Sequence, residues 1–312
     1  MTGSSPPGGS SPPAHVPVGI QPHGCLLACD ATATTVLRHS TNAGSMLGVD
    51  GPLNGRALAD LIGTAAVHDL RNATTKATDG ARPALLPGFP LANGRAFDVA
   101  VHRLDATVIV EFEPANPATS DALQMTREMI GRISEVADAD TLIRRATRLV
   151  QAMLGYDRVV VCRFGADGAG RVVGEACRPD LEPLLGQSLS ASILPAQARS
   201  RPRTAIRVIP DATGQPVAIE PELDEAGATL DLSLAQLRSV PPAHGEDLRR
   251  LGVSASMTMP VVVDGSLWGL IACLHGAPRT LPTGERIAAE LFGQFFSLHL
   301  AALRPPVDEG RQ

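Results

Sequence analysis

Side chains that could carry out chemistry are few in this chain, and their spacing is irregular. Cys25 and Cys29 lie four residues apart, with His23 two residues before the first of them. Cysteine and histidine bind zinc, but this group lacks a fourth ligand and the spacing usual in zinc sites. We therefore interpret it as part of a buried strand. The five cysteines of the chain, an odd number at scattered positions, predict reduced thiols in the cytoplasm.

The acidic and glycine-rich segments do not predict a catalytic site either. Two acidic pairs, Asp224-Glu225 and Glu246-Asp247, have no nucleophile or base beside them, so solvated surface charge is the simpler interpretation. Residues 165–170 are rich in glycine but lie between two strand patterns with no helix after them, unlike a phosphate-binding loop. We expect a protein that is not an enzyme.

Composition is that of a globular protein and excludes several classes. Of the 312 residues, 44% are apolar and 19% charged, which is enough for two domains with separate cores. The net charge of -5 gives no attraction to nucleic acid or to an anionic membrane. No apolar run reaches the roughly 20 residues of a membrane span. Residues 1–13 are rich in Ser, Gly and Pro and lack an apolar signal segment, so we expect a disordered leader over residues 1–15.

Residues 16–115 predict a first α/β domain. Two short strands, at 25–29 and 35–38, precede three short helices at 42–47, 56–61 and 65–76. Residues 84–91 and 95–104 form two further strands joined by Asn93-Gly94, a strong signal for a tight hairpin. A last strand covers 107–112 and alternates apolar with polar residues. Two strands, a helical segment and three antiparallel strands follow the order of a PAS domain.

Residues 118–305 predict a second domain, followed by a tail at 306–312. Two helices lead into strands at 158–164 and 171–176, and the second helix has an apolar stripe at Leu142, Ala146, Leu149 and Met153. The Pro- and Gly-rich stretch 179–242 is mostly irregular, and such segments often form a pocket wall. A hairpin of two strands, at 254–263 and 266–273, and a final helix at 284–303 complete the order of a GAF domain.

The final helix has an apolar stripe at Ile287, Leu291, Phe295 and Leu298. Packing of this stripe into the core is its simplest interpretation. A homodimer interface along the same stripe is the alternative.

Six short sequence words resemble bacterial phytochromes in order and spacing, and together they span most of residues 16–278. They are GIQPHG (19–24), RPDLEP (178–183), PAQAR (195–199), DLS (231–233), LRSV (237–240) and LWGLIAC (267–273). The resemblance implies a mixed α/β (α+β) fold, a PAS domain followed by a GAF domain, each an antiparallel sheet flanked by helices. It also implies a knot, in which the segment around Ile20 threads through a loop of the GAF domain. The GAF pocket of the family holds biliverdin, whose isomerisation by red light drives signalling.

The chain departs from the family where biliverdin would be attached. Family members use a cysteine shortly before the GIQPHG word, but residues 1–22 contain none, and Cys25 falls inside the first PAS strand. Plant phytochromes attach their chromophore through a cysteine just before the pocket histidine, and this chain has Ala243 at that position. Ile193 occupies the position where the family has the aspartate that organises the pyrrole water. An isoleucine can accept no hydrogen bond from the ring N–H groups, and each buried donor left without a partner costs roughly 1–3 kcal/mol. Leu274 occupies the position of the second histidine of the family's pocket.

The aromatic residues that surround the chromophore in the family are also missing. Their positions correspond to Cys162, Leu189, Pro202 and Asp247, in a chain with only 3% aromatic residues. At Cys162, a small buried side chain is a simpler interpretation than a reactive thiol.

Other parts of the pocket match the family. Arg207 and Arg238 correspond to the arginines that bind the propionates, and guanidinium groups suit carboxylates. Ordinary ion pairs within the protein are the alternative for both. Ser256 and Thr258 correspond to the supporting hydroxyls, and His244 to the histidine over the pyrrole rings. Leu194 and Pro195 belong to the same candidate, non-covalent pocket.

We expect a phytochrome-like sensory module that has lost covalent biliverdin binding and normal photochemistry. It would act without a cofactor, or with another carboxylate-bearing ligand, as a cytoplasmic homodimer through its C-terminal helix, signalling to a partner protein not identified by the sequence. A red-light photoreceptor that binds biliverdin non-covalently is the alternative.

Overall fold

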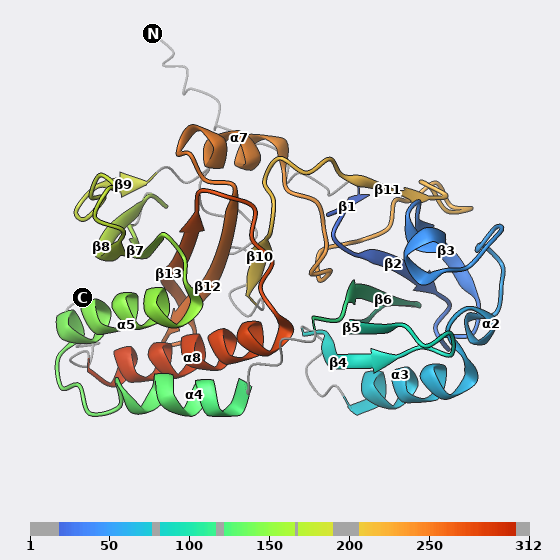
Figure 1. Cartoon of the computed structure of the whole chain (residues 1–312), viewed down its shortest axis with the longest axis horizontal. Helices are drawn as coiled ribbons and strands as arrows, with labels where there is room; N and C mark the ends of the chain where they lie inside the picture. Colours follow the sequence, from blue (N-terminus) through green and yellow to red (C-terminus); the bar gives the residue numbers. More distant parts are fainter. Residues whose placement is uncertain (1–18, 77–81, 117–121, 166–167, 190–205, 304–312) are drawn as a thin grey trace, which may run out of the picture.

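Two antiparallel sheets organise the chain, one in each of two α/β units that lie side by side (Figure 1). The structure is a computed structural model, and it describes residues 19–76, 82–116, 122–165, 168–189 and 206–303. The predicted leader and tail fall outside these ranges. Within them, the mixed α/β architecture predicted from the sequence is confirmed.

The first sheet is built from alternating strands that bury one face under three short helices. Its seven strands run in the order β1-β11-β3-β2-β6-β5-β4. The Asn93-Gly94 turn joins β4 to β5 as predicted, with Gly94 at a φ of 81°, where glycine pays no steric penalty. The strands, in chain order, are β1 (Gly19–Ile20), β2 (Cys25–Cys29), β3 (Val36–Ser40), β4 (Ala84–Pro90), β5 (Ala96–Leu104) and β6 (Thr107–Pro114). The helices are α1 (Ala43–Leu47), α2 (Leu58–Ile62) and α3 (Thr64–Lys76).

Both faces of this first sheet are buried along its central strand, β2. Cys25, Leu27 and Cys29 point into the core beneath the helices. The alternate residues Leu26 and Ala28 pack on the other face, against a segment of the second unit. The first sheet is therefore enclosed partly by residues that follow it by more than a hundred positions.

One strand of the first sheet, β11 (Val217–Glu220), comes from the second unit. It pairs with β3 on one side and with β1 on the other. On its other side, β1 meets the segment 237–239: the Gln21 N–H donates to Leu237 O, and the Ser239 N–H donates to Gly19 O. The chain around Ile20 is thus inserted between two parts of the stretch 206–240, the arrangement expected of a knot. The residues before Gly19, which would be threaded, lie outside the described ranges.

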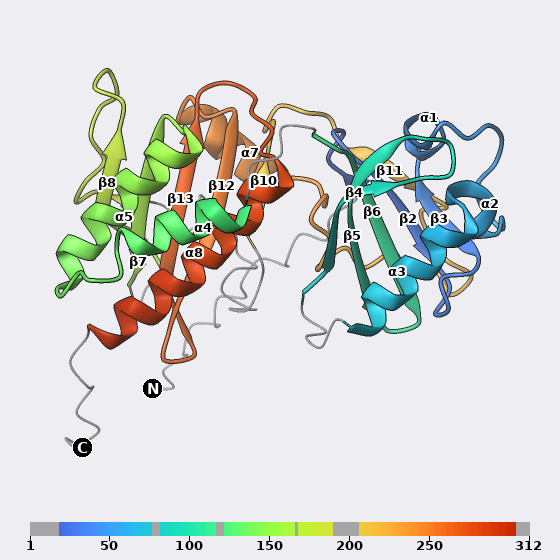
Figure 2. The same ribbon diagram turned by 60° about the horizontal axis from the view of Figure 1, so that its bottom comes forward.

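The second sheet has six strands in the order β10-β12-β13-β7-β8-β9. Figure 2 shows α4, α5 and α8 along one of its faces, and α7 lies elsewhere in the unit. The strands are β7 (Arg158–Phe164), β8 (Gly170–Cys177), β9 (Ser188–Leu189), β10 (Arg207–Ile209), β12 (Ala255–Val263) and β13 (Ser266–His275). The helices are α4 (Ala122–Gly131), α5 (Ala139–Leu154), α7 (Pro242–Arg250) and α8 (Thr283–Ala302).

Helix α5 forms where its end signals and apolar stripe agree. Asp138 caps its first turn by accepting the Thr141 N–H at 2.8 Å, and Gly155 ends it in a left-handed conformation. Leu142, Ala146 and Leu149 are buried against the sheet, as the stripe predicts.

Helix α8 buries a different face from the one we expected. Its core-facing residues are Ala288, Ala289, Phe292, Phe296 and Leu300. Of the predicted stripe, by contrast, Leu291 is 42% exposed and Leu298 is 72% exposed. The helix is apolar on both faces, so the interpretation of the stripe as core packing is wrong for these two leucines.

Candidate functional site

The predicted ligand-binding residues gather on the face of the second sheet that points away from α4, α5 and α8. Successive side chains on a strand alternate between faces. Ser256 and Thr258 therefore point away from Met257 and Met259, which belong to the core on the helix side. Arg207 on β10 lies directly opposite Thr258 on β12.

Helix α7 brings His244 to the same region. His244 is buried, and Leu248 of this helix packs with Ile209 and Leu274 on the open face of the sheet. The candidate pocket residues Leu194 and Pro195, together with Ile193, lie outside the described residues.

Small and aliphatic side chains form two buried clusters on this face. Cys162 and Leu189, at positions that are aromatic in the family, pack together in one buried cluster. The full cluster is Val160, Cys162, Val172, Leu189 and Ala272. The neighbouring cluster consists of Ile209, Leu248, Val253 and Leu274. Neither cluster includes an aromatic ring, so the wall around Cys162 and Leu189 offers a ligand burial without stacking. Farther along the same face, Phe164 of β7 packs with Leu270 of β13 and is aromatic.

The Arg207 guanidinium is used by the protein itself. Its Nη1 donates to Gln236 O at 2.9 Å, and its Nη2 donates to Arg238 O at 2.6 Å and to Ser239 O at 3.2 Å. Burial lowers the pKa of Arg207, and the nearby charge of Arg238 lowers it further. This arginine closes the segment 236–239 onto β10, a role that neither the ligand clamp nor the ion-pair alternative described.

Arg238 lies in the same segment and is partly buried. Its Nη1 donates to Ala235 O at 2.6 Å. Burial lowers its pKa, while the Glu111 carboxyl acts in the opposite direction. Two arginines are therefore held close together at the junction of the two units, with Glu111 as the acidic group that faces both.

Glu111 is a buried carboxyl on β6 that binds the second unit. Its Oε2 accepts the Leu237 N–H at 2.6 Å, whereas its Oε1 has no hydrogen-bond partner among the described residues. Burial raises the pKa of Glu111 to about 7, against the backbone N–H groups of Leu237 and Gln236, which lower it. His102 Nδ1 lies 3.8 Å from Oε1, and burial lowers the pKa of His102 to about 4.

None of the cysteines has the properties of a reactive nucleophile. All five lie within the described residues, and none forms a disulfide. Cys25, Cys29, Cys162 and Cys273 are buried, and desolvation raises the pKa of the first three to about 12 and that of Cys273 further. Cys177 is half-buried, and burial together with Glu175 raises its pKa as well. Because the thiolate is the reactive form, these thiols are poorly suited to attack a ligand.

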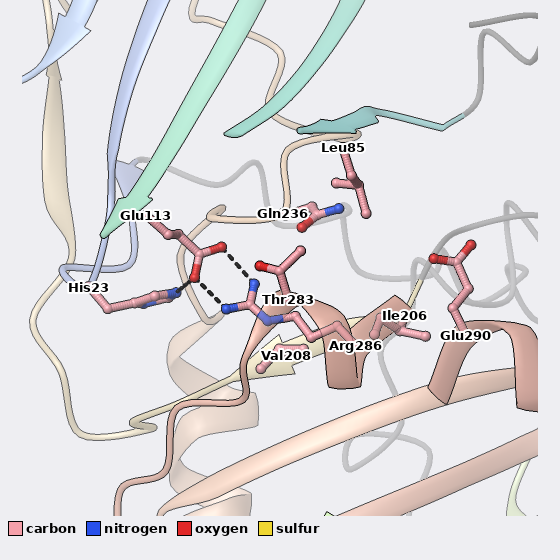
Figure 3. Close-up of a pocket in the computed structure, with 9 residues that line it drawn as sticks. All are labelled: His23, Leu85, Glu113, Ile206, Val208, Gln236, Thr283, Arg286 and Glu290. Carbon is pink, nitrogen blue, oxygen red and sulfur yellow. Dashed lines mark hydrogen bonds and ion pairs between the residues drawn. The ribbon is translucent and has the colours of Figure 1, made fainter. Parts of the chain in front are cut away.

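A buried ion cluster at the junction was not found from the sequence. Arg286 of α8 binds Glu113 of β6 through both carboxylate oxygens, at 2.6 and 2.5 Å, and His23 Nε2 lies 3.3 Å from the same carboxylate (Figure 3). Burial opposes ionisation of Glu113, but the charge and hydrogen bonds of Arg286 and the hydrogen bond of His23 hold its pKa well below the usual range. The cluster ties the first sheet to the beginning of α8.

A small cavity of about 20 Å³ adjoins this ion cluster, and Gln236, Thr283 and Ile206 also line it (Figure 3). A cavity of that size accommodates about one water molecule and no organic ligand. A second, more open pocket of about 330 Å³ is lined by His23, Glu113 and Arg286 as well. The sequence signals His23, which belongs to the GIQPHG word, but nothing in the sequence pairs it with Glu113 and Arg286, which are far away in the chain.

No group of three or more His, Cys, Asp or Glu side chains in the described part of the chain is arranged to hold a metal ion. None of the helices that the structure describes is both long enough and apolar enough to cross a bilayer.

Comparisons with known proteins agree with this arrangement. A PAS fold model matches residues 10–115, and a GAF domain model matches residues 138–302. The chain is 34% identical over 307 residues to a bacteriophytochrome of Pseudomonas aeruginosa, covering 96% of this chain and 40% of that protein. It is also 34% identical over 305 residues to a bacteriophytochrome of Xanthomonas campestris, covering 94% of this chain and 47% of that protein. The chain thus spans less than half the length of these relatives.

A solved structure matches the whole arrangement. It is the chromophore-binding domain of an unusual bacteriophytochrome, RpBphP3, from R. palustris. The TM-score is 0.82 and the sequence identity is 31%, and the match covers 94% of this chain and 97% of the other.

Proposed function

Since the chain belongs to the phytochrome family, as a PAS–GAF photosensory module, we propose that it does not bind biliverdin covalently and lacks normal phytochrome photochemistry. The observation behind this proposal is the state of its five cysteines, which are buried or have raised pKa values. Cys25, the nearest to the GIQPHG word, is 0% exposed inside the first core. A thioether to a bilin would require this side chain to leave that core and ionise.

The lining of the GAF sheet supports the second part of the proposal. Two positions that are aromatic in the family are occupied by Cys162 and Leu189, which pack in one aliphatic cluster. Aromatic contacts contribute about 0.5–1.5 kcal/mol each beyond burial, and none is available from this cluster. Arg207 commits three of its five N–H donors to backbone carbonyls, so fewer donors remain for a propionate. The module is therefore proposed to work without a ligand or with another carboxylate-bearing molecule.

Non-covalent biliverdin binding is the second candidate. It is favoured by the placement of Arg207, Ser256 and Thr258 on one face of the sheet, with His244 beside them. The related R. palustris structure is described as a chromophore-binding domain. In this candidate the bilin would supply the light absorption, and this chain would supply burial and a cationic end.

The two candidates separate when purified protein is mixed with biliverdin and its absorbance is recorded before and after red illumination. We expect the spectrum of free biliverdin and no bilin fluorescence on a denaturing gel stained with zinc. A red band that photoconverts but leaves no adduct would support the second candidate. A covalent adduct would refute the proposal.

The variant Ala243→Cys tests whether the pocket or only the attachment has been lost. Ala243 is exposed at the start of α7 beside His244, so a thiol there is accessible. If the pocket still admits biliverdin, this variant should form an adduct that the original chain does not. A variant that remains colourless supports loss of the pocket itself.

A homodimer through α8 is the assembly we propose. Leu291 and Leu298 are exposed on this helix, and Leu123 is 77% exposed on α4, which packs against α8. Burying such leucines against a second copy would contribute about 1.5–3 kcal/mol each at best. Leu291→Glu combined with Leu298→Glu should produce monomers in sedimentation analysis. Leu251→Glu, at the 40% exposed leucine that follows the last residue of α7, is the matched control.

We also propose that the module binds and signals rather than catalyses, and that it works in the cytoplasm. Free thiols fit a reducing compartment. The acidic pair Glu246-Asp247 interacts with Arg250 on α7; the Glu246 side chain is exposed and that of Asp247 is mostly buried. A protein partner would then receive the signal.

A further inference from the structure

A large groove lies far from the candidate ligand pocket, on the outer face of the first sheet. It is bounded on one side by β3 and the β5–β6 hairpin, and on the other by residues 221–231 of the second unit. Its volume is about 790 Å³, within the range of sites that bind organic ligands or peptide side chains. The groove therefore differs in scale from the small cavity beside Arg286.

The floor and walls of the groove are apolar. Val36, Ile109 and Leu230 line it together with Leu37 and Leu223. Leu37 of β3 is 44% exposed and Leu223 of the segment 221–231 is 49% exposed, and both line the groove. Two large leucines that face solvent across a concave surface provide a place for an apolar side chain.

The rim of the groove is acidic. Asp105, Asp224, Glu225 and Asp231 line it, and Arg38 is the one Lys, Arg or His among its lining residues, all of which are described. Arg38 is already engaged: its Nη2 lies 3.1 Å from Asp224 Oδ2 and donates to Ala228 O at 2.8 Å. Along the chain, residues 208–237 contain six acidic residues and no Lys, Arg or His. After Arg38 has neutralised Asp224, three carboxylates remain at the rim.

The acidic wall is held in place by its own hydrogen bonds. Asp224 Oδ1 accepts the N–H groups of Ala226 and Ala228 at 2.9 and 2.8 Å, and the Asp224 N–H donates to Ala228 O at 3.0 Å. This turn fixes the position of Glu225 without using its carboxylate. A wall that is formed before binding avoids the entropy loss of ordering a loop.

We propose that this groove binds a basic, amphipathic peptide segment of a partner protein. An apolar side chain of the peptide would insert between Leu37 and Leu223, and its Lys or Arg side chains would approach Asp105, Glu225 and Asp231. The charge of the rim selects cationic partners and excludes nucleic acid and other polyanions. The groove is lined both by the first sheet and by residues 221–231, which follow the strand β11 that pairs with β1. The peptide would therefore contact both units at once.

The proposal is tested by fluorescence anisotropy on the full chain. The probe is a short fluorescein-labelled peptide with two leucines separated by lysines, and its counterpart has glutamate in place of each lysine. We expect saturable binding of the lysine peptide, weakened by added salt, and no binding of the glutamate peptide. Equal binding of both peptides, or no saturable binding of the lysine peptide, would overturn the proposal.

Two double variants locate the binding. Leu37→Ser with Leu223→Ser removes the apolar anchors, and Asp105→Asn with Glu225→Gln removes rim charge; asparagine tolerates the positive φ of 52° at position 105. Each double variant should lower the affinity for the lysine peptide by about tenfold or more. Leu185→Ser with Glu246→Gln, an exposed leucine and an acid elsewhere, is the matched control and should bind as the original chain does. If the groove variants also bind as the original chain does, the site lies elsewhere and the proposal is wrong.

Discussion

Replacing Glu111 by glutamine should change how the stability of this protein depends on pH. The buried carboxyl has a pKa of about 7 in the folded protein and an ordinary value of 4.5. Between these values the folded protein still holds the proton that the unfolded chain has released. Folding therefore takes up a proton in this range, and the free energy of unfolding falls as pH rises.

The expected size of the effect follows from the two pKa values. Each pKa unit corresponds to 1.36 kcal/mol, so Glu111 lowers the free energy of unfolding by about 3 kcal/mol between pH 4.5 and pH 7. His102 acts in the opposite direction. Its pKa falls from 6.5 to about 4, so the unfolded chain binds the proton first and stability rises with pH in that range. The two groups largely offset each other in the original protein.

The measurement is urea unfolding at a series of pH values from 4 to 8, for the original chain and for Glu111→Gln. Glutamine keeps an oxygen that can accept the Leu237 N–H but has no proton to release. The free energy of unfolding of the original chain, relative to that of the variant, should fall by about 3 kcal/mol between pH 4.5 and pH 7. Glu246→Gln, which removes an exposed carboxyl, should leave the profile unchanged. Parallel curves for the original chain and Glu111→Gln would refute the account of a buried, protonated Glu111.

Three further predictions concern the junction, the second sheet and the assembly. Arg286→Met should lower the free energy of unfolding by about 3–5 kcal/mol, because it leaves the nearly buried Glu113 carboxylate without its main counter-charge. The double variant Glu113→Gln with Arg286→Met should recover part of this loss in the same denaturation assay. An equal loss in the single and the double variant would contradict the reasoning. Arg171→Glu should stabilise the protein by about 0.5–1 kcal/mol, because Arg171 lies directly opposite Arg163 in the β7–β8 pair, and an unchanged or lower melting temperature would contradict this. Leu291→Glu with Leu298→Glu should convert dimers to monomers at equal protein concentration, whereas unchanged sedimentation would exclude α8 as the interface.

Local patterns predicted the elements of this fold well. The strands on either side of Asn93-Gly94, the stripe of α5 and the hairpin of β12 and β13 depend on neighbouring residues, so their sequences contain the signal. Helix α7 was missed between the stretch 179–242, which was expected to be irregular, and the hairpin that begins at 254. It starts at Pro242, a residue suited to a first helical turn, and its apolar residues are few.

Non-local contacts could not be predicted in the same way. Strand β11 has four residues, too few for a reliable alternation, and its partners β1 and β3 belong to the first unit. For α8, both faces are apolar, and the sequence does not say which one meets the sheet. Choosing the stripe at Leu291 and Leu298 as the core was wrong for this reason.

The candidate site shows the same limit for side chains. The sequence placed Arg207, Ser256 and Thr258 in one pocket, and the strand pairing brings these residues to one face. Residue type alone could not show that the guanidinium of Arg207 is bonded to three backbone carbonyls. The segment 236–239 supplies those carbonyls, and its position depends on the insertion of Gly19–Gln21 beside it.

Incubation of the purified chain with biliverdin, followed by a denaturing gel stained with zinc and by absorbance spectra under red illumination, tests the central claim most directly. Five cysteines that are buried or have raised pKa values predict no fluorescent band on the gel, and an aliphatic pocket wall predicts no photoconverting red band. A fluorescent band together with a red absorbance that photoconverts would contradict the claim and show a working photoreceptor.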